Sequence, residues 1–217
     1  MLYLIFAESA IFDISSGELL HTFTKPGQIS SQHSRWSVAL DGNFALIGEY
    51  LDPLGQQKNS GQSKSSAYLF DTRSGELLHK LTAPDAADWD WFGSSVSISE
   101  NFALIGAYGD DDNGERSGSA YLFDTRSGDF LQKLTAPDGV SEDGFGIVAL
   151  DGETALVGAI GSGAPYKHLE GAVYSFKLTD DSQEEQPQSV PEPASLLGLF
   201  TLSGLGMSLL LNRKVND

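Results

Sequence analysis

Residues 67–85 read "AYLFDTRSGELLHKLTAPD", and residues 120–138 repeat them as "AYLFDTRSGDFLQKLTAPD". Sixteen of the nineteen positions are identical, and the two copies are 53 residues apart. A shorter copy, "AIFDISSGELLHTFT", begins at Ala10, and a more distant one, "AVYSFKLTDD", begins at Ala172. Self-similarity at a fixed period is typical of repeat architectures, so the chain is predicted to build one structural unit several times.

A second repeated run lies between these copies. It reads "SVALDGNFALIGEY" from Ser37, "SVSISENFALIGAY" from Ser95 and "IVALDGETALVGAI" from Ile147. Phe-Gly precedes two of the three runs, at residues 92–93 and 145–146, whereas Ser34-Arg35 stands before the first. Short segments rich in Val, Ile, Leu and Phe, bounded by Gly, Asp and Asn, predict β-strands.

Each unit is predicted to contain four short antiparallel strands, which in the central unit are Ser95–Ser99, Phe102–Tyr108, Ala120–Phe123 and Phe130–Thr135. Tight turns at residues 41–42, 100–101 and 151–152 join the first two strands. Asp-Gly at two of these turns predicts type I′ hairpins, which need positive φ at both central positions. In the turn at residues 124–128, Gly128 is expected in the left-handed conformation and Asp124 is expected to bind turn amides.

Repeated hairpins of this size predict an all-β, propeller-like array of about three and a half four-stranded blades over residues 1–180. Closed propellers have four to eight blades, and an open array exposes strand edges. The chain is expected to begin mid-blade, with a strand pair at Leu2–Phe6 and Ala10–Ile14, and "MLYLIFAESA" lacks the basic region of a signal peptide. These features indicate a fragment of a longer propeller, or self-association that completes the ring.

Phe-Gly followed by an apolar strand ending in Gly-Ala resembles the FG-GAP repeat of integrin-α-type propellers. "GAY" at Gly106–Tyr108 stands where that family has Gly-Ala-Pro, and the resemblance covers residues 10 to 178. The family often carries a calcium loop between the two strands of this motif. Here two-residue turns stand in that place, and they cannot supply the 6–8 oxygens that Ca²⁺ requires. We therefore expect the family's calcium site to be absent.

The charge of the chain excludes some classes of partner. Thirty acidic residues against thirteen basic ones give a formal net charge of −17, which disfavours nucleic-acid binding. The sequence has no cysteine, which excludes disulfides, thiolate metal sites and cysteine nucleophiles.

The C-terminal part differs from the repeats. Residues 181–189 are acidic and rich in Gln, and they predict a disordered linker. The 18 residues from Ala194 to Leu211 carry no charge, and as a helix they would span about 27 Å, close to the hydrocarbon core of a bilayer. Arg213 and Lys214 follow and are expected to stay cytoplasmic by the positive-inside rule. The sequence therefore predicts one C-terminal transmembrane helix.

The whole segment from residue 190 to 214 resembles the PEP-CTERM sorting signal of Gram-negative bacteria. The signal residues are Val190, Pro191, Glu192 and Pro193, followed by the apolar segment and the basic pair Arg213 and Lys214. The resemblance implies that an exosortase, a membrane-embedded protease, recognises Pro-Glu-Pro and removes the helix. It also implies delivery to the cell surface or an exopolysaccharide matrix. Three residues, Val215–Asp217, follow the basic pair and depart from the family's usual end.

Two acidic groups could carry chemistry. The loop at Asp110–Asn113 offers oxygens to a hard cation, but its carboxylates lack the alternating spacing of an EF-hand, so a solvated turn is favoured over a calcium site. Asp85 and Asp90 recur as Asp138 and Asp143 just before each Phe-Gly. Paired carboxylates can hydrolyse glycosides, but recurrence at one repeat position favours a structural turn.

The histidines and tryptophans also bear on the function of the chain. The four histidines show no metal-ligand spacing, and His21 and His79 share one repeat position. Trp36, Trp89 and Trp91 are expected to pack in the core or between blades, with sugar stacking as the alternative.

The sequence thus favours an exported, non-catalytic interaction protein that needs no metal or other cofactor, with a glycan or a surface protein as its ligand. A carbohydrate-active hydrolase and a passive matrix component are the alternatives.

Overall fold

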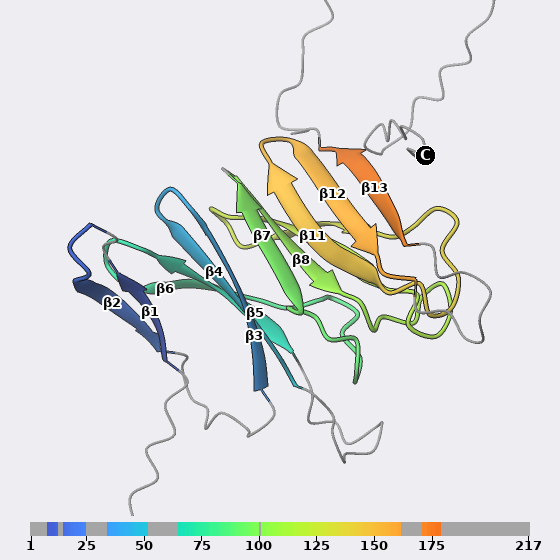
Figure 1. Cartoon of the computed structure of the whole chain (residues 1–217), viewed down its shortest axis with the longest axis horizontal. Helices are drawn as coiled ribbons and strands as arrows, with labels where there is room; N and C mark the ends of the chain where they lie inside the picture. The colour runs from blue at the N-terminus through green and yellow to red at the C-terminus, as the bar shows by residue number, and fades with distance from the viewer. Residues whose placement is uncertain are drawn as a thin grey trace, which may run out of the picture.

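The structure is a computed structural model that describes residues 8–12, 15–24, 34–51, 65–99, 101–161 and 171–178. In these ranges the chain forms antiparallel strands and no helix, arranged as four sheets side by side (Figure 1). The sheets, in chain order, are β1 (Glu8–Phe12) and β2 (Leu19–Thr24); β3 (Ser34–Asp41), β4 (Phe44–Leu51), β5 (Ser66–Asp71) and β6 (Leu77–Leu81); β7 (Ser95–Ser99), β8 (Phe102–Ala107), β9 (Ser119–Asp124) and β10 (Phe130–Leu134); and β11 (Phe145–Asp151), β12 (Thr154–Ala159) and β13 (Ala172–Lys177).

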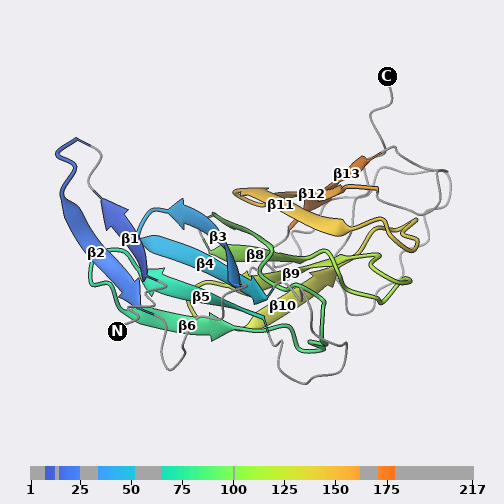
Figure 2. The same cartoon turned by 60° about the horizontal axis from the view of Figure 1, so that its bottom comes forward.

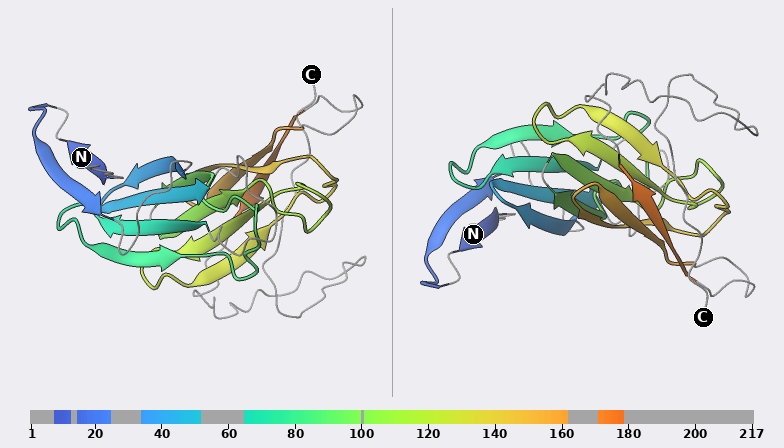
Figure 3. Two further views of the ribbon diagram at one scale, coloured as in Figure 1. Left: turned by 90° about the horizontal axis from the view of Figure 1, so that it is seen from below. Right: turned by 90° about the horizontal axis from the view of Figure 1, so that it is seen from above.

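This architecture confirms the predicted all-β fold of consecutive antiparallel blades. Each sheet pairs its strands in chain order, and the central sheet has the four strands expected from the repeat to within a residue or two at each end. The sheets stack face to face in a curved row (Figures 2 and 3). At the N-terminal end β1 pairs with β2. The predicted partner strand Leu2–Phe6 lies outside the described residues.

The hairpins that join the first two strands of a sheet differ from the prediction. Asp41 pairs with Phe44, so the two central turn residues are Gly42 and Asn43 rather than Asp41 and Gly42. Only the first of them has positive φ, at 54°. The turn at Gly152, with φ of 51°, repeats this arrangement. One positive φ at the first central position is the pattern of a type II′ turn, so the predicted type I′ geometry is wrong.

The turn between the third and fourth strands agrees with the prediction. Asp124 Oδ1 accepts hydrogen bonds of 2.8 Å from the backbone N–H groups of Arg126 and Ser127, and Gly128 has a φ of 77°. Asp71 does the same one sheet earlier, where the amides of Ser74 and Arg73 lower the pKa of its carboxyl. The repeated "DTRSG" is therefore a turn in which the first Asp satisfies two backbone donors.

The core lies between sheets, not within one. Leu46, Leu69 and Leu81 of the second sheet pack against Ile105, Phe123 and other residues of the third. The equivalent faces meet between the third and the last sheet, where Leu104 and Leu122 pack against Val157 and Phe176. Burial of one face against the neighbouring copy is what a repeat unit needs for stability.

The recurring spacing of Phe-Gly and the strand glycine has a steric reason at these interfaces. Phe92 and Phe145 are buried and make edge-on contacts with aromatic rings of the third strand. The glycine that follows each Phe meets a glycine of the preceding sheet at very short range. A Cβ on Gly48 would lie 2.3 Å from the carbonyl oxygen of Gly93, and one on Gly106 would lie 1.8 Å from that of Gly146. Glycine is required where two backbones approach this closely.

Serines join the inner strands of the third and last sheets. The backbone N–H groups of Val148, Leu150 and Gly152 donate to the hydroxyl oxygens of Ser95, Ser97 and Ser99, at 3.1, 2.9 and 2.9 Å. This row lies where the innermost strands of neighbouring blades meet, and it fixes the register of one sheet on the next.

At the two ends of the row, the described residues form sheets of fewer than four strands. β1 and β2 occupy the positions of the third and fourth strands of the other sheets. Phe23 of β2 packs on Tyr68 and Phe70 of the second sheet, just as Leu81 of β6 packs on the third sheet. Residues 179–217 lie outside the described residues, and with them the predicted linker at 181–189, the sorting signal and the helix at 194–211. Within the ranges that are described, no apolar helix of bilayer-spanning length occurs.

Candidate ligand-binding loop surface

Three loops gather at one end of the third and last sheets. They are residues 82–94, 108–118 and 135–144, and we call them together the loop surface. Backbone hydrogen bonds join them: Gly109 N–H donates to the Asp90 carbonyl at 3.1 Å, and Glu142 N–H donates to the Glu115 carbonyl at 2.7 Å. Loops held by bonds to one another present their exposed side chains in a fixed arrangement.

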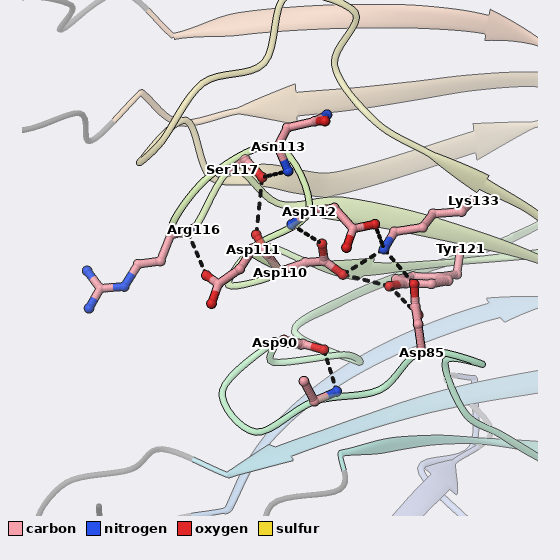
Figure 4. Close-up of polar contacts among 11 residues, drawn as sticks. Asp85, Asp90, Asp110, Asp111, Asp112, Asn113, Arg116, Ser117, Tyr121 and Lys133 are labelled. Carbon is pink, nitrogen blue, oxygen red and sulfur yellow. Dashed lines mark hydrogen bonds and ion pairs between the residues drawn. The ribbon is translucent and has the colours of Figure 1, made fainter. Parts of the chain in front are cut away.

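A cluster of carboxylates around one ammonium lies beneath this surface (Figure 4). Lys133 Nζ, from β10, lies 2.7 Å from Asp85 Oδ2 and 3.0 Å from Asp110 Oδ2, and it also donates to Asp112. Tyr121 Oη lies 2.7 Å from Asp110 Oδ2 and 2.9 Å from Asp85 Oδ1, so its single proton donates to one of them at a time. The cluster ties the loop that follows the second sheet to two strands of the third.

The electrostatics of the cluster favour its charged form. Burial alone would lower the pKa of Lys133, but the hydrogen bonds to Asp112, Asp85 and Asp110 outweigh it, so the pKa is raised above its ordinary value. Burial would raise the pKa of Asp85, but Lys133 and Tyr121 hold it below its usual range. Burial and the bond to Asp110 raise the pKa of Tyr121, which therefore stays a phenol and a donor.

Asp85, Asp110 and Asp112 each offer a carboxylate oxygen within 4.8 Å of the others, the spacing of a cation site. Lys133 supplies the positive charge at this place. Of the predicted loop Asp110–Asn113, the first Asp is buried in the cluster, while Asp111 and Asn113 are exposed and make turn contacts. The loop is thus organised by contacts with the protein's own groups, and its first Asp is buried rather than solvated as the turn interpretation expected.

Part of this cluster recurs. Tyr174 Oη donates to Asp138 Oδ1 at 2.7 Å, and both residues hold the repeat positions of Tyr121 and Asp85. Burial and the bond to Asp138 raise the pKa of Tyr174. Two of the four predicted carboxylates, Asp85 and Asp138, are therefore acceptors for a tyrosine of the following sheet.

The other two predicted carboxylates close a turn. Asp90 Oδ2 accepts a hydrogen bond of 2.7 Å from Ala87 N–H, and Asp143 Oδ2 accepts one of 2.8 Å from Val140 N–H. Asp90 is buried, and burial raises its pKa to about 6, helped by the charges of Asp110 and Asp111 and opposed by the Ala87 bond. Recurrence of the same bond supports the structural interpretation of this position.

Replacement of Asp90 by Asn should change how stability depends on pH. The unfolded carboxyl ionises near 3.8 and the folded one near 6, so the wild type loses stability as pH rises through this window. Asn keeps an oxygen for Ala87 N–H but carries no charge. We expect Asp90→Asn to match the wild type near pH 4 and to be more stable by about 1–3 kcal/mol above pH 6.5, by urea unfolding. Asp143→Asn, at the same turn in a more exposed setting, should change stability little, and an equal gain there would contradict the argument.

Aromatic and charged side chains occupy the loop surface beside Asp90. Trp91 lies with its ring centroid 4.6 Å from that of Tyr108, and the guanidinium carbon of Arg116 is 6.0 Å from the Trp91 ring. Arg116 also pairs with Glu142 at 3.3 Å. Trp89 and Trp91 have positive φ, 79° and 54°, an uncommon conformation for bulky residues. Trp91 therefore packs against a residue of a neighbouring loop rather than in the core or between blades, and its side chain remains partly exposed.

The remaining predicted residues are distributed as follows. His79, half-buried on β6, contacts the Arg126 carbonyl of the next sheet at 3.0 Å. The sorting-signal residues Val190 to Pro193, with Arg213 and Lys214, lie outside the described residues. The sequence pattern did not predict the role of Lys133. The pair of Tyr and Asp that recurs with a separation of 36 residues could have indicated the contact between successive sheets.

The repeats of this chain are similar to a known repeat family. Residues 77–123 and 129–176 each match the FG-GAP repeat. Two segments, which together make up less than half of the chain, are thus similar to FG-GAP repeats. Each matched segment begins at the fourth strand of one sheet and ends in the third strand of the next, so the sequence repeat spans the interface between two blades.

No curated protein matches the chain. Among solved structures, the dihydro-heme d1 dehydrogenase NirN in complex with DHE is similar at 13% identity and a TM-score of 0.40. The alignment covers 77% of this chain and 30% of that one, so the chain spans less than a third of that protein's length.

Proposed function

We propose that this chain is an exported, non-catalytic interaction protein of the cell surface or the extracellular matrix. The two FG-GAP repeats carry this proposal, because such repeats suggest an adhesion-type domain that works outside the cell. The loop surface supports it, since its polar and aromatic side chains are held in place by bonds between loops. Function in repeat folds commonly lies in such loops.

The ligand in this proposal is a glycan or another surface protein. Trp91 and Tyr108 offer partly exposed rings for stacking, and Arg116 lies beside the Trp91 ring. Asp111 and Asn113 are exposed on the same loop surface and offer further polar groups. The non-catalytic part of the proposal is supported by the bonds of the four predicted carboxylates. Each accepts a hydrogen bond from a tyrosine or from a turn amide.

The second part of the proposal concerns export. The segment at 190–214 would hold the chain in the membrane through the helix at 194–211 until an exosortase acts at Pro-Glu-Pro. The body would then be released to the surface or the matrix. Its charge of −17 suits such a soluble, extracellular protein.

Cell fractionation with mass spectrometry of the mature C-terminus tests export and processing. We expect the native host to hold the protein outside the cytoplasm with its C-terminus near Val190. A variant with Pro191 and Pro193 replaced by Ala should keep its full length and stay in the membrane fraction. An intact wild-type chain that ends at Asp217 in the cytosol would refute this part of the proposal.

Glycan-array binding tests the ligand. Binding that is lost on Trp91→Ala and kept on Trp36→Ala, a tryptophan of β3 outside the loop surface, supports the interaction role. The absence of binding by the folded protein to glycans and to surface proteins of its host would favour the passive matrix component instead.

A further inference from the structure

The last sheet exposes an apolar outer face. Ile147, Leu156, Ile160 and Val173 are exposed to 52, 43, 51 and 67%. They line a shallow groove together with Gly158 and Ala172. No described strand lies over this face (Figure 2). We call it the outer face. Contiguous exposed apolar patches are rare on soluble monomers and mark interaction sites.

The same face is a protein interface in the two preceding sheets. Leu46 and Leu104 hold the repeat position of Leu156, and both are fully buried by the following sheet. Ala67 and Ala120 hold the position of Val173 and are also fully buried. The outer face thus continues an established interface of this chain and has the residue types that pack against another β-sheet.

A substitution at a position that bonds the next sheet distinguishes the outer face from its two counterparts. Ile147 stands where Ser37 and Ser95 stand in the earlier sheets. Both serines hydrogen-bond the following sheet, Ser37 to the Gly93 carbonyl at 2.7 Å and Ser95 to the Val148 amide at 3.1 Å. Isoleucine cannot make such a bond, so the outer face is adapted to an apolar contact rather than to the usual next blade.

We propose that the outer face of one copy packs against the outer face of a second copy, in a two-fold symmetric dimer. Stacked sheets bury such faces against each other about 10 Å apart, and two-fold dimers are the commonest assemblies. A head-to-tail contact would need the face of β3, where Val38 and Leu40 are exposed. There β1 and β2 already hold the third and fourth strand positions, which leaves no room for a three-stranded sheet.

The proposal is independent of any ligand of the loop surface, and it differs from closure of a ring. It also predicts a salt dependence. Two copies of charge −17 repel each other, and salt screens this repulsion. Dimerisation should therefore be tighter in 0.5 M than in 0.05 M NaCl.

Sedimentation of the full-length chain and its variants tests the contact. Leu156→Glu and Val173→Glu each place a charge in the outer face, and we expect the dimer dissociation constant to rise more than about 100-fold. Leu131→Glu is the matched control, since Leu131 of β10 is exposed to 44% but lies outside this face; it should dimerise like the wild type. Both Glu variants should keep the wild-type circular dichroism spectrum. Association unchanged by them would overturn the proposal and assign it to another surface or to residues 179–217.

Cysteine cross-linking distinguishes the symmetry, because the chain has no cysteine of its own. We expect at least one of Ile147→Cys, Leu156→Cys and Val173→Cys to cross-link to its own copy under mild oxidation. Val38→Cys should not. If only a mixture of Val38→Cys with Leu156→Cys cross-links, the contact is head-to-tail and the two-fold proposal is wrong. It is equally wrong if none of the three single variants forms a cross-linked dimer.

Discussion

Gly106→Ala is expected to destabilise the protein by about 3–5 kcal/mol, a large part of the stability of a domain of this size. The added Cβ would lie 1.8 Å from the Gly146 carbonyl oxygen and 2.8 Å from its carbonyl carbon. Both atoms are backbone, so no side chain can move aside. The third and last sheets would have to separate, which also weakens the contacts of Leu104 and Leu122 with the last sheet.

The chain provides its own control for this prediction. Gly158 holds the repeat position of Gly106, but a Cβ there would meet its nearest neighbour, Ile147 Cβ, at an ordinary 3.5 Å. Gly158→Ala should therefore change stability by less than about 1 kcal/mol. The direction should be stabilising, because alanine reduces the conformational entropy of the unfolded chain. Urea unfolding of both variants at one protein concentration measures the difference. Equal effects would show that the close approach of Gly106 and Gly146 does not hold the sheets together.

These glycines show how far the sequence predicts the fold. The repeats and their alternating apolar residues predicted the strands and the "DTRSG" turns, because both depend on residues close in the chain. The hairpin at Gly42 was displaced by one position, since pairing of Asp41 with Phe44 moves the turn centre and strand register is set by the whole sheet. Which glycine meets which depends on how sheets stack, and periodicity within one sheet carries no information on that.

The carboxylate cluster was not predicted for a related reason. Its members come from two loops and two strands, at positions 85, 110, 112, 121 and 133, and only the fold brings them together. Local spacing indicated separate acidic loops, one a candidate cation site and one a candidate catalytic pair. Repetition was the better guide, since it assigned Asp90 and Asp143 to a turn.

The second large effect is expected from Lys133→Met. Methionine has a similar length but no charge, so Asp110, which is buried, would keep a hydrogen bond from Tyr121 and lose its ion pair. Removal of one partner of a buried ion pair leaves an uncompensated charge and is strongly destabilising. Because Asp85 and Asp112 are largely exposed, we expect a loss of about 2–4 kcal/mol at neutral pH, below the value for a fully buried group.

The pH dependence of this loss follows from the two shifted pKa values. The raised pKa of Lys133 means that its contribution is complete below 10.5 and disappears as pH rises through the folded value. The lowered pKa of Asp85 means that its contribution is complete above 3.8 and disappears as pH falls through the folded value. The difference between wild type and variant should thus be constant from about pH 5 to 9 and shrink in acid, when the carboxyls take up protons.

Lys80→Met is the matched control, because Lys80 holds the repeat position of Lys133 one sheet earlier and its side chain is exposed. It should cost less than about 0.5 kcal/mol. Urea unfolding of both variants at pH 3, 5 and 7 measures the comparison. A loss in Lys133→Met that is the same at pH 3 and pH 7 would assign the effect to the packing of the side chain on Tyr121, whose ring centroid lies 5.0 Å from Nζ. A loss that vanishes only in acid would instead identify the ammonium of Lys133 as the charge that holds the carboxylates of two successive blades together.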